Sequence, residues 1–344
     1  MQIDWGIVLA GVLVGFTVGL TGMGGGALMT PILLIFFNVT PSAAVSSDLI
    51  AAMIMKPIGG GVHIRRKTVR WDLVRWLCIG SIPTAFAGVF LLNSIGDSEK
   101  IEEITKTFLG VTLLLAATAM IVKAWIQGRR AAKARLEGRA PAAGGPLHMR
   151  IIPTVVIGMV GGLLVGLTSV GSGSIVIICL MLLYPVLRGA ELVGTDLVQA
   201  VPLVSAAAIA HIIIGDFELA LTASILIGSI PAVWVGARLS SRAPDGVIRP
   251  ILVFVLAASA LKLLGLPNGM LGGVMLAVAL IGLPLWGAVD AASHPERQWE
   301  AAGESRRSWI KRQAWLAPVG LGFAYAVAYS ARIRPMLLVS TEGS

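Results

Sequence analysis

The chain has 344 residues, of which 56% are hydrophobic and 13% are charged, and its formal net charge is +9. A mean hydropathy of +0.86, with apolar runs of about 20 residues along nearly the whole length, is typical of an integral membrane protein and excludes a separate soluble domain. Lysine and arginine gather in the loops, so the positive charge indicates topology in the lipid bilayer and argues against a nucleic-acid partner.

A glycine-rich stretch interrupts the first apolar segment, which has no charged residue from Trp5 to Ser47. Five of the ten residues from Gly19 to Leu28 are glycine, and each costs about 1 kcal/mol in a helix interior relative to alanine. We therefore expect two short spans that meet at a break. Small residues also allow close packing of unbroken membrane helices, which is the alternative interpretation.

Three longer spans are expected next, at about 43–62, 73–92 and 104–126, after a turn at 38–42 that starts a helix. The first of them carries Asp48 and Lys56 inside an otherwise apolar sequence. The loop that follows it is basic, and the loop after the second is acidic. The polar segment 127–150 is rich in arginine, alanine and glycine, which predicts a flexible cytoplasmic linker.

The second half of the chain repeats the first. Asp48, His63 and the Gly-Ser-Ile-Pro segment at 80–83 recur 148 residues later, at Asp196, His211 and 228–231. The glycine-rich stretch recurs at 166–175 with an offset of 147 residues. A single deletion in a loop explains the difference of one residue between the two offsets. The repeat indicates duplication, and paired glycine-interrupted segments predict the binding site of a transporter.

The loop charges are reversed between the halves. The loop after the third segment is basic in the first half and acidic in the second, and the next loop shows the opposite change. Five segments per half is an odd number, so the second half enters the membrane from the other side and every basic loop is cytoplasmic. We expect an all-α, inverted-topology repeat in the cell (inner) membrane, with the N-terminus outside.

The expected organisation is a first transmembrane repeat at 1–126, a linker at 127–150, a second repeat at 151–265 and a C-terminal part at 266–344. Uncharged runs at 269–289 and 313–331 predict an additional helical pair in the last part, joined by a loop at about 290–312.

The glycine-rich openings of both halves, the Gly-Thr-Asp-Leu sequence at 194–197, the two histidines and the twin Gly-Ser-Ile-Pro segments resemble the sulfite exporter TauE/SafE family. The resemblance covers about residues 6–265. It implies a pseudo-twofold helical fold and secondary transport of small sulfur-containing anions such as sulfite, sulfonates or related organosulfur compounds. Lys56 departs from the family pattern.

The candidate anion site lies at the two helix breaks, where free N–H groups and the helix dipole attract anions. Hydroxyls can add donors there, although each can instead bond a carbonyl of its own helix. Lys56 either contacts the anion, extends to the cytoplasmic face or pairs with Asp48. The expected substrate-binding residues are Thr21, Gly22, Gly24, Gly25, Gly26, Lys56, Thr168, Ser169, Gly171, Ser172, Gly173 and Ser174.

Four titratable residues are candidates for coupling or gating. Asp48 and Asp196 can carry coupling protons, although capping of their own helices is the favoured interpretation. His63 and His211 can act as gates or proton relays, or as ordinary interfacial side chains. The sequence assigns no coupling ion, transport direction or oligomeric state.

An enzyme is not expected, because the four histidines lack the spacing of a metalloprotease motif and no nucleophile motif is present. We therefore assign no catalytic residue, metal or cofactor. Cys78 and Cys179 lie in apolar segments and predict no disulfide. The alternatives to a sulfur-anion permease are a passive small-anion channel and a transporter of another small organic anion.

Overall fold

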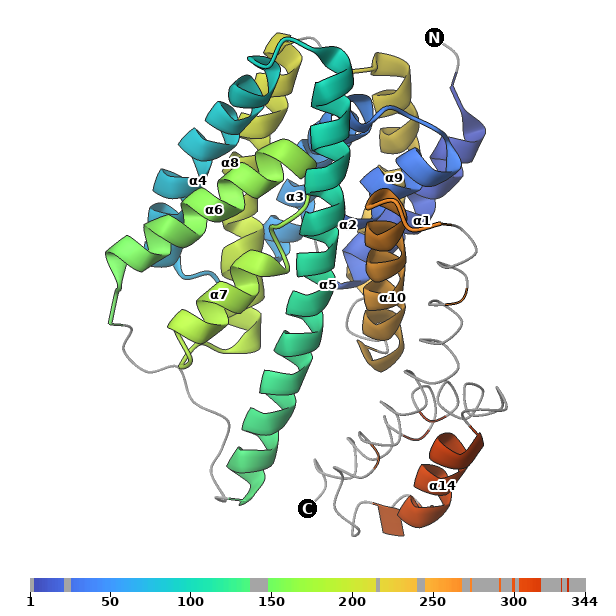
Figure 1. The fold of residues 1–344 in the computed structure, drawn as a ribbon. Coiled ribbons are helices and arrows are strands. Elements are labelled where there is room, and N and C mark those ends of the chain that lie inside the picture. The colour runs from blue at the N-terminus through green and yellow to red at the C-terminus, as the bar shows by residue number, and fades with distance from the viewer. Residues whose placement is uncertain are drawn as a thin grey trace. The chain divides into compact units, whose positions relative to one another are not determined.

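The computed structural model describes residues 3–21, 26–136, 148–214, 217–239 and 245–267, and, towards the C-terminus, residues 273, 291, 299–300, 303–316, 329 and 333. Within these residues the fold is all-helical, with no strand (Figure 1). The first half contains α1 (Trp5–Thr21), α2 (Gly26–Phe36), α3 (Pro41–Arg65), α4 (Trp71–Asn93) and α5 (Ser98–Leu136). The second contains α6 (Ile151–Thr168), α7 (Ile175–Leu183), α8 (Gly189–Ile214), α9 (Leu219–Leu239) and α10 (Asp245–Leu263), and α14 (Arg306–Leu316) follows.

Five of these helices are long and apolar enough to cross a bilayer: Trp71–Asn93, Ser98–Ala124, Ile151–Thr168, Gly189–Ile214 and Leu219–Gly236. The two short segments expected around the second glycine motif are α6 and α7, and of these α7 is too short to cross a bilayer. Its 9 residues rise only about 14 Å, whereas a bilayer core is about 30 Å thick. The protein is therefore a multi-pass membrane protein in which the second glycine motif joins the long helix α6 to the short helix α7.

Helices α6 and α7 form a hairpin whose outer ends lie together. The hydroxyl of Tyr184, directly after α7, lies 3.0 Å from the backbone nitrogen of Arg150 and 2.6 Å from the hydroxyl of Thr154 at the start of α6. The turn of the hairpin, at 169–174, is consequently its far end. All six turn residues are buried, so the helix break lies inside the protein.

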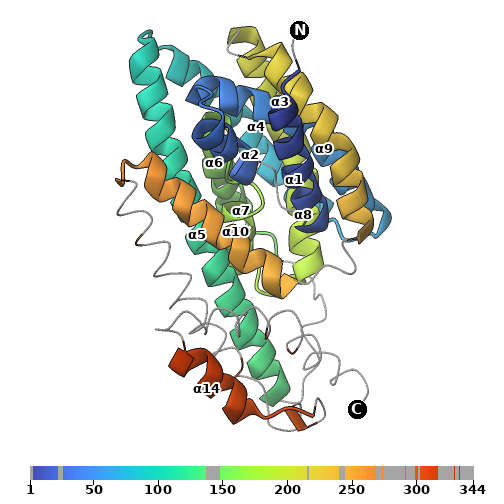
Figure 2. The same cartoon turned by 90° about the vertical axis from the view of Figure 1, so that its right-hand side faces the viewer.

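The first helix of each half packs against the fourth helix of the other half. Helix α1 lies beside α9 (Figure 2), and α6 packs against α4. The two contacts are equivalent residue by residue: a Cβ added to Gly15 would lie 2.7 Å from the Cα of Ser229, and one added to Gly162 would lie 2.7 Å from the Cα of Ser81. Glycine is required at both positions because the backbones approach too closely for any side chain.

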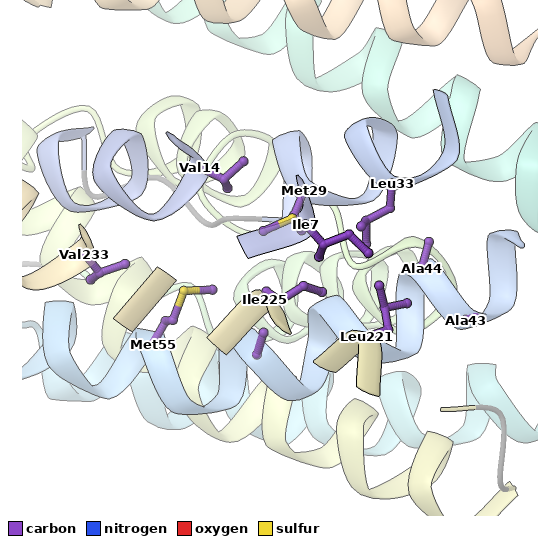
Figure 3. Packing of buried hydrophobic residues seen from close by; sticks show 11 residues of the cluster. Ile7, Val14, Met29, Leu33, Ala43, Ala44, Met55, Leu221, Ile225 and Val233 are labelled. Atoms are coloured by element: carbon purple, nitrogen blue, oxygen red, sulfur yellow. The ribbon is translucent and has the colours of Figure 1, made fainter. Parts of the chain in front are cut away.

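The buried apolar clusters show the same exchange. One cluster joins α1, α2 and α3 of the first half to α9 of the second, through Ile7, Val14, Met29, Leu33, Ala43, Ala44, Ala51, Met55, Leu221, Ile225 and Val233 (Figure 3). A second cluster joins α7 and α8 to α4 and contains the repeat counterparts of several of these residues, among them Leu73, Leu77, Val176 and Leu180. Neither cluster is built from one half alone.

Helices α3 and α8, which are repeat counterparts, pack antiparallel. The space beside Gly60 is filled by Val198 and Val201, whereas the space beside Gly194 is filled by His63 and Thr68. Moving forward along α3 therefore means moving backward along α8. The loop after α3 is held to the start of α8 by an ion pair between Arg70 and Glu191 (2.9 Å) and by the bond from the Arg70 N–H to the hydroxyl of Thr195 (3.1 Å).

Contacts divide the chain into two compact units, residues 1–242 with 259–264, and residues 243–258 with 265–344. In the second unit, Trp299, Trp309 and Tyr329 pack with Ala291 and Ile333, and the Trp299 and Tyr329 rings stack with centroids 6.0 Å apart.

Two local predictions need correction. Helix α5 continues to Leu136, so the predicted linker is helical at its start, and α14 begins at Arg306, inside the predicted loop at 290–312. Most of the expected C-terminal helical pair, and residues 137–147 of the linker, lie outside the described residues.

Candidate functional site

Among the residues that the structure describes, three charged side chains are buried inside the helical bundle. Asp48 and Lys56 lie on α3 with exposed fractions of 0% and 5%, and Asp196 lies on α8 with 2%. Capping does not explain the carboxylates: α3 begins at Pro41 with Thr40 as its N-cap, and α8 begins at Gly189, so both aspartates lie beyond the first turn. Burying a charge in a membrane protein is costly and usually reflects function.

The second glycine motif forms a helix break, as predicted. Helix α6 ends at Thr168 and α7 begins at Ile175. Ser169 has a φ of +60°, Gly171 of +135° and Gly173 of +90°. Glycine adopts these angles readily and other residues rarely do, so the two glycines allow the chain to turn sharply between the helices.

Lys56 reaches this break. Its Nζ donates a hydrogen bond to the Ser172 hydroxyl over 2.8 Å, although the two residues are 116 positions apart. The side chain is directed inward, not to the cytoplasmic face, so the snorkelling interpretation is wrong. Lys56 interacts electrostatically with Asp196 first and with Asp48 to a smaller degree.

The two carboxylates have different surroundings. Asp196 accepts a hydrogen bond from the backbone N–H of Gly173 in the break. One oxygen of Asp48 accepts hydrogen bonds from the hydroxyls of Thr30 on α2 (3.1 Å) and Ser169 (2.5 Å). The second oxygen of each carboxylate, Oδ1, is buried and has no hydrogen-bond partner among the described residues.

Other predicted site residues have separate places. Thr168 donates a hydrogen bond to the Leu164 carbonyl over 2.7 Å, as expected if its hydroxyl bonds a carbonyl of its own helix. Ser174 is buried beside the break. Helix α1 ends at Thr21 and α2 begins at Gly26. Gly22, Gly24 and Gly25 lie outside the described residues, as do the side chain of Thr21 and the burial of Gly26.

The two histidines differ in burial. His211 is buried, and its Nε2 lies 3.2 Å from the Gly166 carbonyl, just before the break. His63 is half-buried, and its Nδ1 lies 2.9 Å from the Thr68 hydroxyl. Partial burial lowers the pKa of His63, and the charge of nearby Arg66 lowers it further. His63 therefore faces the loop after α3, whereas His211 faces the helix break.

Sequence reasoning missed Thr30, Ser81 and Gln199. Gln199 on α8 is fully buried and donates to the Ser81 hydroxyl on α4 over 2.9 Å. The repeat held a signal that could have identified Thr30 and Gln199. Their counterparts in the other half are apolar: Ile177 for Thr30 and Ala51 for Gln199. Both residues therefore break the internal symmetry, as Lys56 does, whose counterpart is Val204.

Together these groups make a polar centre suited to an oxyanion. An ammonium, a serine hydroxyl and the backbone of a helix break converge at Ser172, and ammonium and N–H groups donate strong hydrogen bonds to anions. The described residues contain no group of three or more His, Cys, Asp or Glu side chains arranged to hold a metal ion.

Comparison with known proteins gives one family. Its model, described as sulfite exporter TauE/SafE, matches residues 7–263 and confirms the resemblance. The chain is 39% identical over 259 residues to the probable membrane transporter protein YjnA of Bacillus subtilis, covering 75% of this chain and 98% of that protein. It is 24% identical over 263 residues to the probable membrane transporter protein YdhB of the same organism, covering 75% and 99%. No solved structure matches.

Proposed function

We propose, because this chain belongs to the sulfite exporter TauE/SafE family of membrane transporters, that it is a secondary transporter of small sulfur-containing anions. The family consists of transporters and not of enzymes. The observation that carries the proposal is the buried ammonium of Lys56 on the hydroxyl of Ser172, at a helix break inside the protein. A cation there attracts an oxyanion strongly, since little water screens it.

The substrate is proposed to bind between Lys56 and the break at 169–174. Sulfite and sulfonates carry several acceptor oxygens on one sulfur atom. Such a group can accept hydrogen bonds from an ammonium, a hydroxyl and backbone N–H groups at once, and a helix N-terminus adds the favourable end of its dipole. In the proposed bound state, the anion replaces the direct bond between Lys56 and Ser172.

We further propose that the two halves form an inverted-topology repeat and that the site alternates between the two faces of the membrane. The antiparallel packing of α3 against α8 supports this, as does the exchange of helix contacts between the halves. The reversed loop charges set the orientation, with the N-terminus outside.

The orientation predicts which loops a membrane-impermeant maleimide reaches in intact cells, in a background where alanine replaces Cys78 and Cys179. Single cysteines at Asp97 and Glu218 are expected to be labelled. Cysteines at Arg66 and Arg238 are expected to be labelled only after the membrane is opened. Labelling of positions 66 and 218 from the same side would contradict the inverted repeat.

The substrate class is tested by thermal stabilisation of the purified protein with sulfite, thiosulfate, methanesulfonate and acetate. An anion at about 100 times its dissociation constant adds about 2.7 kcal/mol of stability, so the true substrates are expected to raise Tm. Saturable uptake of the same anions into proteoliposomes is expected to follow. A larger Tm rise with acetate would indicate an organic-anion transporter, and conductance without saturation would indicate a channel.

A further inference from the structure

The buried charges of the site do not balance. Asp48, Lys56 and Asp196 carry one positive and two negative charges when all three are ionised, and each is almost fully buried. An anion that binds beside Lys56 adds another negative charge to a centre that is already negative. In a poorly screened interior such an excess is strongly unfavourable, so uptake of a proton with the anion restores the charge of the empty site.

The structure distinguishes the two carboxylates as acceptors of that proton. Asp196 is the stronger electrostatic partner of Lys56 and accepts the Gly173 N–H. The Gly173 N–H can only donate a hydrogen bond, and the charge of Lys56 attracts an ionised carboxylate, so both favour the charged form of Asp196. Asp48 instead accepts from the hydroxyls of Thr30 and Ser169. A hydroxyl can donate or accept, so these partners suit both the ionised and the protonated acid.

The repeat shows that this difference is specific to one half. The counterpart of Thr30 is Ile177, that of Ser169 is Gly22 and that of Lys56 is Val204. The duplicated carboxylates have thus acquired different neighbours: Asp48 accepts from two hydroxyls and has the weaker interaction with Lys56, whereas Asp196 accepts from a backbone N–H and has the stronger one. The Oδ1 atom of Asp48, like that of Asp196, is buried and has no hydrogen-bond partner among the described residues, so it leaves room for a proton.

We propose that Asp48 is the proton-binding residue that couples anion movement to proton movement, with the proton carried on its Oδ1 while the anion is bound at Lys56. This inference rests on the proposed transport function. One proton enters from water with each anion and leaves with it on the other side. The Asp196 carboxylate stays ionised throughout as the partner of Lys56.

Few other titratable groups face Asp48. Lys56 lies on its own helix, and Asp196 and His211 lie on α8. Lys123 of α5 interacts with Asp196. Helices α2 and α6 carry no titratable side chain, and the charged residue of α9, Arg238, lies in its last turn over the ring of Trp234.

The test measures how pH changes the affinity for sulfite, thiosulfate and methanesulfonate, in the wild type and in Asp48→Asn. Because the wild type and Asp48→Asn are compared with the same anion, any effect of protonation of the anion itself on the measured affinity is the same for both proteins. In the wild type, affinity for methanesulfonate or thiosulfate is expected to rise as pH falls, by at most about tenfold per pH unit for one linked proton. Asp48→Asn mimics the protonated acid, so its affinity is expected to be high and independent of pH.

Transport in proteoliposomes provides the second measurement. Asp48→Asn is expected to exchange labelled for unlabelled anion and to lose accumulation driven by a pH gradient. Asp97→Asn, an acid in an exposed loop, is the matched control and is expected to keep both activities. Tm of each variant reports folding, and should Asp48→Asn not fold, proton uptake on anion binding by the wild type, followed with a pH dye, decides the question.

The outcomes separate the two proposals. If the wild type neither binds nor transports any of the three anions, the proposed function is wrong. If it transports them but Asp48→Asn keeps the pH dependence and the gradient-driven accumulation, the inference about Asp48 is wrong while the function stands. The inference also fails if accumulation follows a sodium gradient and not a pH gradient, or if no proton is taken up when the anion binds.

Discussion

Replacement of Lys56 by alanine is expected to weaken anion binding about 10- to 150-fold, because a hydrogen bond to a charged group contributes about 1.5–3 kcal/mol. The Nζ of Lys56 donates to Ser172 at the helix break and lies in a buried site, so no other described side chain supplies a cation beside that hydroxyl. Lys56→Arg keeps the charge and is expected to lose less. The measurement is anion affinity by calorimetry or by the shift in Tm.

The same substitution leaves Asp196 buried without its strongest electrostatic partner, so Lys56→Ala is also expected to lower Tm. The double variant Lys56→Ala with Asp196→Asn removes that isolated charge. It is expected to recover much of the stability but not the anion affinity, which separates a structural role from a binding role. Unchanged affinity in Lys56→Ala at low and at high salt would show that the anion binds elsewhere.

Replacement of Gly162 by leucine is expected to prevent accumulation of folded protein. A Cβ at this position would lie 2.7 Å from the Cα of Ser81, which is backbone and cannot move aside as a flexible side chain can. Overpacking costs about 1–3 kcal/mol where a core can adjust, and more is expected where two backbones are in contact. The measurement is the yield of monodisperse protein in detergent and its Tm.

Gly15→Leu is expected to have the same effect, since Gly15 lies equally close to Ser229 in the equivalent helix pair. Gly61 provides the matched control, because a Cβ at that glycine of α3 would meet no atom within 4 Å. Gly61→Leu is therefore expected to fold. Normal yield and Tm for Gly162→Leu would mean that α4 and α6 do not pack as the structure shows.

The sequence was sufficient to predict the helices, the duplication and the break at 169–174, because these depend on local composition and on an internal repeat. It also made Lys56 and Ser172 separate candidates for the site. Their contact could not be predicted, since it joins α3 of one half to the hairpin of the other and depends on how the halves pack. The same is true of Thr30, Ser169 and Asp48, which come from three different segments.

Two errors have physical reasons. Asp48 was interpreted as a cap because it lies near the start of the span expected at about 43–62, whereas α3 begins at Pro41 and Thr40 is its N-cap. Snorkelling of Lys56 was a reasonable expectation for a long side chain near a basic loop. Sequence spacing alone does not show that Ser172 and Asp196, both from the other half, lie near Lys56 in the interior.

The exchanged helix pairs also constrain how the protein is made. Helix α1 gains its glycine-lined partner only when α9, at Leu219–Leu239, has left the ribosome. The first half must therefore remain in the membrane during synthesis with two glycine faces uncovered. Two copies of one half, inserted in opposite directions, could cover those faces for each other. Such a pair of identical short chains is the assembly from which gene fusion would yield a protein of this design.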